Sequence, residues 1–195
     1  MQDKMTAFKE LMGEIWDLNM ASALLGWDMQ VNMPPKGAED RGDILSTIAR
    51  LIHQKSTSDE AGRLLEELSS HALNLDPDSD DACLIRRAKR EYDKNTRVPV
   101  QWVAEFSRIT AMAHEIWAQA RQESNFALFQ PYLQQIVDLR RQYSDFFKPY
   151  DHVYDPLLDD FEPGLKTAEV QAIFQPLRTH QVELIHAIAK RPQVN

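Results

Sequence analysis

The chain has 195 residues, a formal net charge of −8 and one cysteine, Cys83. Scarce glycine and frequent helix-forming residues predict an α-helical protein with a core of its own. The acidic excess argues against nucleic acid or an anionic membrane as a partner, and one cysteine allows neither an intrachain disulfide nor a thiolate metal cluster. With no apolar segment long enough to span a bilayer, these features predict a cytoplasmic protein.

In chain order, apolar residues recur every three or four positions, which is typical of helices with one buried stripe. The first stretch runs from about Thr6 to Leu25 and precedes two prolines at 34–35. A second helix is expected from Ala38, a third behind the capping-box pattern of Thr57 and Glu60, and a fourth behind an acidic run.

Two prolines then mark helix starts. Pro99 is expected to open a long fifth helix in which Trp117 is a central core residue, and Pro131 to open a sixth. Three further prolines and a glycine interrupt the pattern at about 148–166, which predicts a structured loop before a last helix. We therefore expect an all-α, irregular array of about seven helices forming a single helical region over residues 1–195.

Histidines supply no complete metal site in this pattern. His114 and Glu115 begin like a helical H-E-x-x-H zinc motif, but the second histidine position holds Ala118. Glu183 and His186 have the spacing of a carboxylate-bridged di-iron bundle, which needs a second such pair that the sequence lacks. We predict no metal-ligating and no catalytic residue in this chain, and these histidines are expected on helix surfaces or between helices.

Three segments nevertheless carry a family resemblance: LLGWDMQVNMPPKGAEDR at 24–41, RRAKREYDKNTRVP at 86–99 and YDPLLDDFEPGLKTAEV at 154–170. They resemble the amino-terminal part of the carboxypeptidase Taq family, the thermostable zinc metallocarboxypeptidases, and the likeness runs over essentially the whole chain. The resemblance implies a helical fold with a deep groove, and a homodimer that removes amino acids from the C-termini of peptide substrates.

The resemblance also implies zinc chemistry, with the metal held by H-E-x-x-H and a downstream glutamate. Those motifs lie in the carboxyl-terminal portion of the family, beyond residue 195. We therefore expect this chain to be a truncated form that binds no zinc and is inactive alone. The alternative is a stand-alone helical module that binds a protein partner through one face.

Five residues in the resembling segments are candidates for the substrate groove. Trp27 and Asp28 are expected to act as a buried anchor and a loop-capping carboxylate. Asp159, Asp160 and Glu162 are expected to line an acidic rim. The competing interpretation is that these residues fix loop geometry and helix packing.

Overall fold

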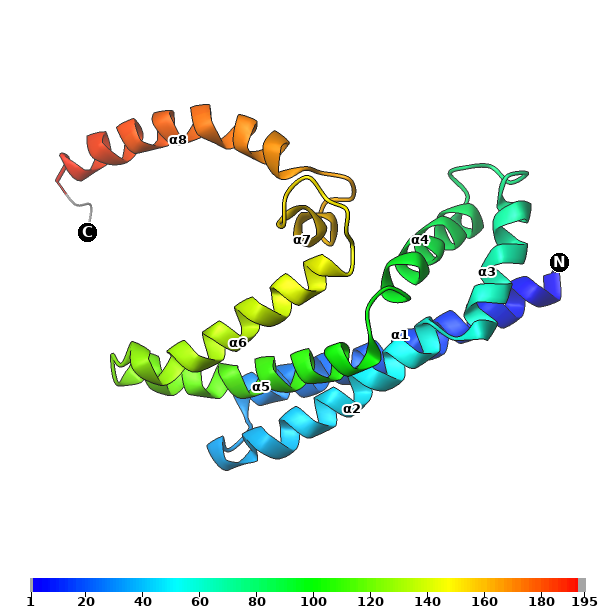
Figure 1. Cartoon of the computed structure of the whole chain (residues 1–195), viewed down its shortest axis with the longest axis horizontal. Coiled ribbons are helices and arrows are strands. Elements are labelled where there is room, and N and C mark those ends of the chain that lie inside the picture. Colours follow the sequence, from blue (N-terminus) through cyan, green and yellow to red (C-terminus); the bar gives the residue numbers. More distant parts are fainter. Residues whose placement is uncertain (1, 193–195) are drawn as a thin grey trace. The chain divides into compact units, whose positions relative to one another are not determined.

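A computed structural model describes residues 2–192, with only the backbone described at Pro35. Within that range the chain is all helical, without a strand, as the composition predicts. The elements are α1 (Gln2–Val31), the 3-10 turn η1 (Pro35–Gly37), α2 (Ala38–Ser56), α3 (Asp59–Ala72), α4 (Asp80–Asn95), α5 (Val100–Gln122), α6 (Phe126–Asp145), α7 (Asp155–Asp159) and α8 (Thr167–Ala189) (Figure 1). They divide into two compact units, Met1–Leu139 and Arg140–Asn195.

In the first unit, α2 packs against both α1 and α5, and α3 packs against α4 and α1 (Figure 1). The core cluster lies where α1, α3 and α4 meet. Phe8 of α1, Leu65 and Leu68 of α3, and Ile85 of α4 are fully buried there. These residues belong to the apolar stripes that helical periodicity predicts, because burial of one face per helix drives the packing.

Helix α1 has a second apolar face opposite the first. The exposed members of this outer stripe follow at intervals of three or four residues: Trp16, Met20, Leu24, Trp27 and Val31. The prediction that Trp27 is a buried anchor is therefore wrong, since 56% of its surface is exposed. The physical reason is register: α1 continues past Gly26 to Val31, and this helical turn places the indole on the face away from the packed stripe.

Several element boundaries also differ from the prediction. Ser58, not Thr57, caps α3, because its hydroxyl accepts a hydrogen bond from the backbone N–H of Ala61 at 3.2 Å. Helix α6 begins at Phe126 and includes Pro131 in its interior. The preceding turn contains Ser124 with φ of 51°, a left-handed conformation that reverses the chain before the proline is reached.

The two tryptophans of α5 differ in burial. Trp102 is buried, stacks on Phe106 with ring centroids 4.9 Å apart, and donates its indole N–H to the carbonyl of Leu139 at 3.0 Å. Trp117, the residue expected at the centre of the core, is 42% exposed and lies under the guanidinium of Arg121. Helical spacing alone does not distinguish the buried tryptophan from the exposed one, because both positions belong to the apolar stripe of the helix.

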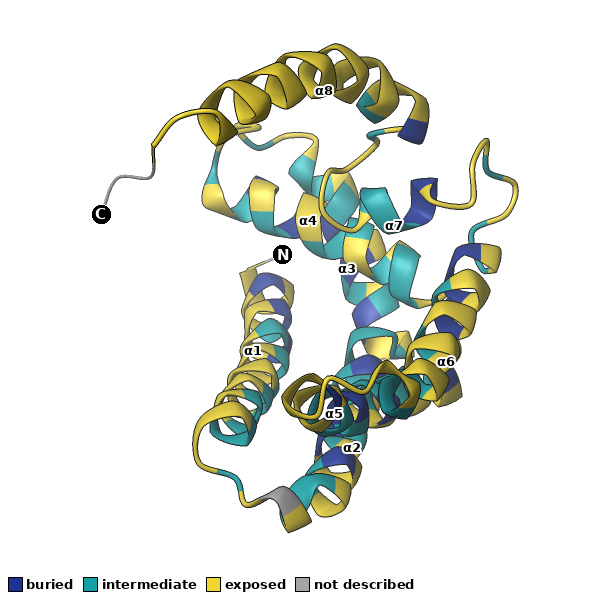
Figure 2. Ribbon diagram, turned by 90° about the vertical axis from the view of Figure 1, so that its left-hand side faces the viewer, coloured by how far each residue is buried: buried dark blue, intermediate teal, exposed yellow. Residues whose placement is uncertain are grey.

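The second unit contains the end of α6, the segment 148–166 and α8. The segment predicted as a structured loop holds the short helix α7 between turns. Burial falls away along α8: Thr167 at its start is buried, whereas every residue from 171 to 192 is exposed (Figure 2).

Candidate functional site

The GWD segment ends α1 in a connection that is fixed by Asp28. Its carbonyl accepts hydrogen bonds from the N–H groups of Asn32 and Met33, and its carboxylate accepts one from Arg41 of α2 at 2.6 Å. Arg41 also donates to the carbonyl of Leu25 at 2.5 Å. One guanidinium thus ties the last turns of α1 to the first turn of α2. A charge-assisted pair of this kind restrains the intervening prolines.

The carboxylate of Asp28 therefore interacts with a different partner from the one predicted. It was expected to cap backbone groups of the loop, but it pairs with the side chain of Arg41, which is 85% shielded from solvent by its surroundings. This arrangement agrees with the structural role that the sequence leaves open for the segment. Trp27, its neighbour, is exposed.

The three acidic candidates of the second unit have separate surroundings. Asp159 accepts a hydrogen bond from the N–H of Gly164 at 2.8 Å and closes a turn in which Gly164 has φ of 84°. Asp160 accepts a hydrogen bond from the hydroxyl of Tyr143 at 2.7 Å. Asp160 and Glu162 are both exposed. Two of the three carboxylates, those of Asp159 and Asp160, thus hold the segment together through hydrogen bonds.

Asp155, which the sequence does not single out, is the most enclosed carboxylate of the segment. Its Oδ1 accepts hydrogen bonds from the backbone N–H and the hydroxyl of Thr167, at 2.8 and 2.7 Å, while Oδ2 accepts one from the N–H of His152. Thr167 is the first residue of α8, so a carboxylate from α7 caps that helix. The two residues are twelve positions apart, beyond any local capping pattern.

Electrostatics in this segment favour an ionised Asp155 beside a neutral Tyr143. The hydrogen bonds from Thr167, first from its backbone and then from its side chain, lower the pKa of Asp155 to about 2. Burial, followed by the hydrogen bond to Asp160, raises the pKa of the Tyr143 phenol. Lys166, next to Asp155, pairs with Asp151 at 3.1 Å. These hydrogen bonds and ion pairs stabilise the local structure of the segment.

Metal-ligating side chains are dispersed in the described chain. Among residues 2–192, no three His, Cys, Asp or Glu side chains lie close enough to hold one ion. The ring of His114 lies 6.0 Å from that of Trp117, centroid to centroid, and His180 and His186 are exposed on α8. The described residues therefore do not fit a metal centre. In the same range, no helix has the length and apolar character needed to span a membrane.

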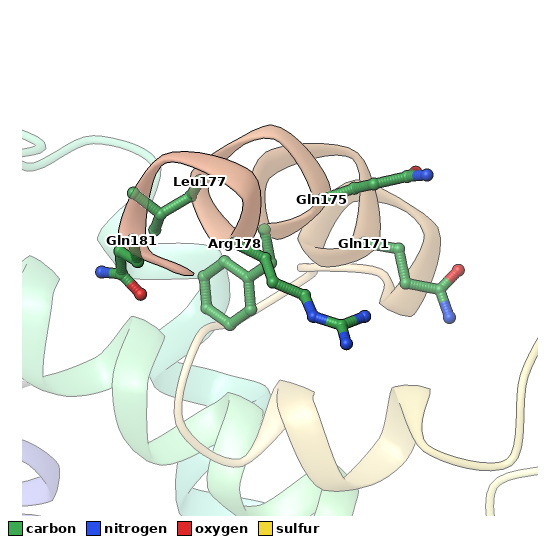
Figure 3. A pocket seen from close by; sticks show the side chains of 6 residues that line it. Gln171, Gln175, Leu177, Arg178 and Gln181 are labelled. Carbon is green, nitrogen blue, oxygen red and sulfur yellow. The ribbon is translucent and has the colours of Figure 1, made fainter. Parts of the chain in front are cut away.

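A shallow pocket lies along α8. It is lined by the apolar side chains of Phe174 and Leu177 together with Arg178 and three glutamines of the same helix (Figure 3). The guanidinium of Arg178 extends outward from the helix, between the side chains of Gln181 and Gln171 (Figure 3). This mixture of apolar and hydrogen-bonding groups is that of a contact surface and lacks a nucleophile.

Comparison with known proteins decides the family. The family model described as carboxypeptidase Taq (M32) metallopeptidase matches residues 7–195. The chain belongs to this family. Carboxypeptidase 1 of Bacillus subtilis (strain 168) is 29% identical over 181 residues, which cover 93% of this chain and 36% of that protein. Thermostable carboxypeptidase 1 of Thermus thermophilus is 30% identical over 185 residues, which cover 89% of this chain and 36% of that protein.

The M32 fold is also found at the level of the backbone. The crystal structure of BsuCP matches with a TM-score of 0.90 and 28% sequence identity, covering 96% of this chain and 37% of that one. These findings confirm the resemblance and the helical fold class. This M32 chain spans 36% of the length of each of the two curated relatives.

Proposed function

We propose that residues 1–195 form the amino-terminal helical region of a zinc-dependent carboxypeptidase, which removes amino acids from the C-termini of peptides. The observation that carries the proposal is the match of the M32 metallopeptidase family over residues 7–195. The shared backbone of BsuCP supports it, because a TM-score of 0.90 over nearly the whole chain requires the same order and packing of helices.

Within such an enzyme, the chain has a scaffolding role. Asp28, Asp159 and Asp160 are engaged with Arg41, Gly164 and Tyr143, respectively, so they hold two connections between helices in place. Trp27, Asp160 and Glu162 are exposed, and their side chains are the candidates for contact with a peptide in the groove. Indole rings suit peptide side chains, and a carboxylate sets the charge of a groove rim.

By itself, the chain does not hydrolyse peptides. Hydrolysis of this class relies on a metal-bound water and a nearby general base. The proposal is supported by the side chains of residues 2–192, among which no three His, Cys, Asp or Glu lie close enough to hold one metal ion. The residues that bind the zinc are supplied by the remaining part of the M32 fold. The complete protein is a cytoplasmic homodimer in this proposal.

The test is hydrolysis of an N-blocked dipeptide by the purified chain, with zinc added and carboxypeptidase 1 of Bacillus subtilis as the positive control. We expect no release of the C-terminal amino acid above the rate with zinc alone. Release that depends on the metal and co-elutes with the chain would show that these helices contain an active site.

A stand-alone interaction module is the second candidate, favoured by the exposed apolar residues of α8. The coding sequence distinguishes the two. A reading frame that continues beyond residue 195 into an H-E-x-x-H motif favours the carboxypeptidase, whereas a stop codon at that point favours the module.

A further inference from the structure

Helix α8 carries a stripe of apolar residues on one face, interrupted by Gln181. The apolar residues recur at helical spacing over more than four turns, and all but the first are exposed: Val170, Ile173, Phe174, Leu177, Leu184, Ile185 and Ile188. Exposed fractions of the last six lie between 45% and 61%. The opposite face carries Thr179, Glu183 and His186.

This division is characteristic of a helix that buries one side against a partner. A helix with polar residues on one face and apolar residues on the other gains stability by packing the apolar face. Within the described part of the second unit, residues 140–192, nothing covers that face, and α8 is drawn as exposed along nearly its full length (Figure 2). An exposed apolar surface of this kind marks an interaction site.

The identity of the partner that covers this face of α8 follows from how much of the M32 fold the chain spans. The BsuCP crystal structure matches 96% of this chain, and the unmatched 4% is shorter than the 23 residues of α8. At least part of α8 therefore lies within the matched backbone. Because only 37% of the BsuCP chain is matched, most of that protein lies outside the shared helices and must contact them somewhere.

We propose that the apolar face of α8 is the docking surface for the part of the M32 fold that this chain does not span. The inference deepens the proposed function and rests on it. The partner surface that fits this face is mainly apolar. Arg178 and Gln181 line the same pocket as Phe174 and Leu177, so the partner surface also presents hydrogen-bond acceptors to these two side-chain donors of α8 (Figure 3).

The test uses a chimaera in which residues 1–195 replace the matched part of carboxypeptidase 1 of Bacillus subtilis. Hydrogen exchange of the α8 amides is measured in the chimaera and in the isolated chain. We expect exchange in the chimaera to be slower by about 100-fold or more, because covered helices open only with the surrounding structure.

Paired variants locate the effect on one face. The substitutions Leu177→Asp and Leu184→Asp together place two charges on the apolar face, and we expect them to reduce the protection of α8 in the chimaera at least about 10-fold. The matched control, Thr179→Asp with His186→Asp, adds two carboxylates to the polar face, outside the lining of the pocket, and should leave protection unchanged. All four residues are exposed in the chain, so none is part of its own core.

Three results would overturn the proposal: equal exchange of α8 in chimaera and isolated chain, equal effects of the two variant pairs, or a chimaera that fails to fold although the isolated chain folds. Protection in the isolated chain that increases with protein concentration would assign the face to a second copy instead. The carboxypeptidase activity of the chimaera is a separate readout, so a protected but inactive chimaera contradicts the proposed function and leaves the docking surface intact.

Discussion

At the scale of single residues, the carboxylate of Asp155 holds the first turn of α8 to α7. Replacement by asparagine keeps the shape but removes the charge that Thr167 and Lys166 face. We expect Asp155→Asn to lower the free energy of unfolding by about 1–2 kcal/mol at pH 7, the usual cost of a lost helix cap. Urea denaturation followed by circular dichroism measures it. Asp151→Asn, at an exposed position, should change stability by less than about 0.5 kcal/mol.

The same carboxylate predicts a dependence on pH. Its pKa is lowered to about 2 in the folded chain, from an ordinary value of 3.8, so the ionised form stabilises the folded state. That stabilisation is complete above the ordinary pKa and is lost as the pH falls towards 2. The stability difference between the wild type and Asp155→Asn should therefore narrow between about pH 4 and pH 2. A constant difference over this interval would contradict the capping role.

Replacement of two glycines by alanine gives a further prediction at the scale of residues. A Cβ at Gly62 in α3 would lie 2.4 Å from the hydroxyl oxygen of Tyr92 in α4 and 3.0 Å from its ring carbon. The gain in helix propensity from Gly62→Ala is outweighed by this overlap, and we expect a net loss of about 1–2 kcal/mol. Gly13→Ala, with nothing within 4 Å, should instead stabilise the chain by about 0.5–1 kcal/mol. Thermal unfolding of both variants measures the opposite signs.

At the scale of elements, α5 should depend on Trp102 and not on Trp117. Trp102→Ala removes a buried stacked ring and leaves the carbonyl of Leu139 without its indole donor. We expect a loss of about 3–5 kcal/mol, against about 1 kcal/mol or less for the exposed Trp117→Ala. Denaturant titration of the two variants tests the assignment. Equal losses of unfolding free energy in the two variants would show that Trp117 is packed as tightly as Trp102.

Helical periodicity predicts most elements of this chain, but it does not predict which apolar face is inside. Phe8 and Trp16 both belong to regularly spaced stripes of α1, and only the first is buried. The burial of a stripe depends on long-range packing, which a local pattern does not contain. One boundary fails for a related reason: Pro131 lies inside α6 and not at its start, because the turn at Ser124 lets the helix begin at Phe126.

The candidate site was predicted only in part. The segments around Asp28 and Asp159 were recognised, and their carboxylates do fix connections between helices. Asp155 was missed because its partner, Thr167, lies in the next long helix, so no spacing within one turn reveals the contact. The exposure of Trp27 was also missed, since a tryptophan before an aspartate is as compatible with an outer stripe as with a core.

At the scale of the whole molecule, two observations agree with helices that pack within a larger body. One is the exposed stripe of α8, and the other is the share of the curated relatives that the chain spans. Six apolar residues in the stripe of α8 are exposed, and the relatives are matched over 36% of their length. Helices selected to pack within a larger body carry apolar residues on faces that a smaller body leaves in water. The net charge and the single cysteine do not reveal this, because neither depends on which surfaces are covered.

The measurement that tests the central claim most directly is the carboxypeptidase activity of the chimaera of residues 1–195 with carboxypeptidase 1 of Bacillus subtilis. If the chain is the helical scaffold of a metal-dependent carboxypeptidase, the chimaera releases the C-terminal amino acid of an N-blocked dipeptide, and a chelator abolishes the release. A folded chimaera with protected α8 amides and no metal-dependent release would contradict the claim.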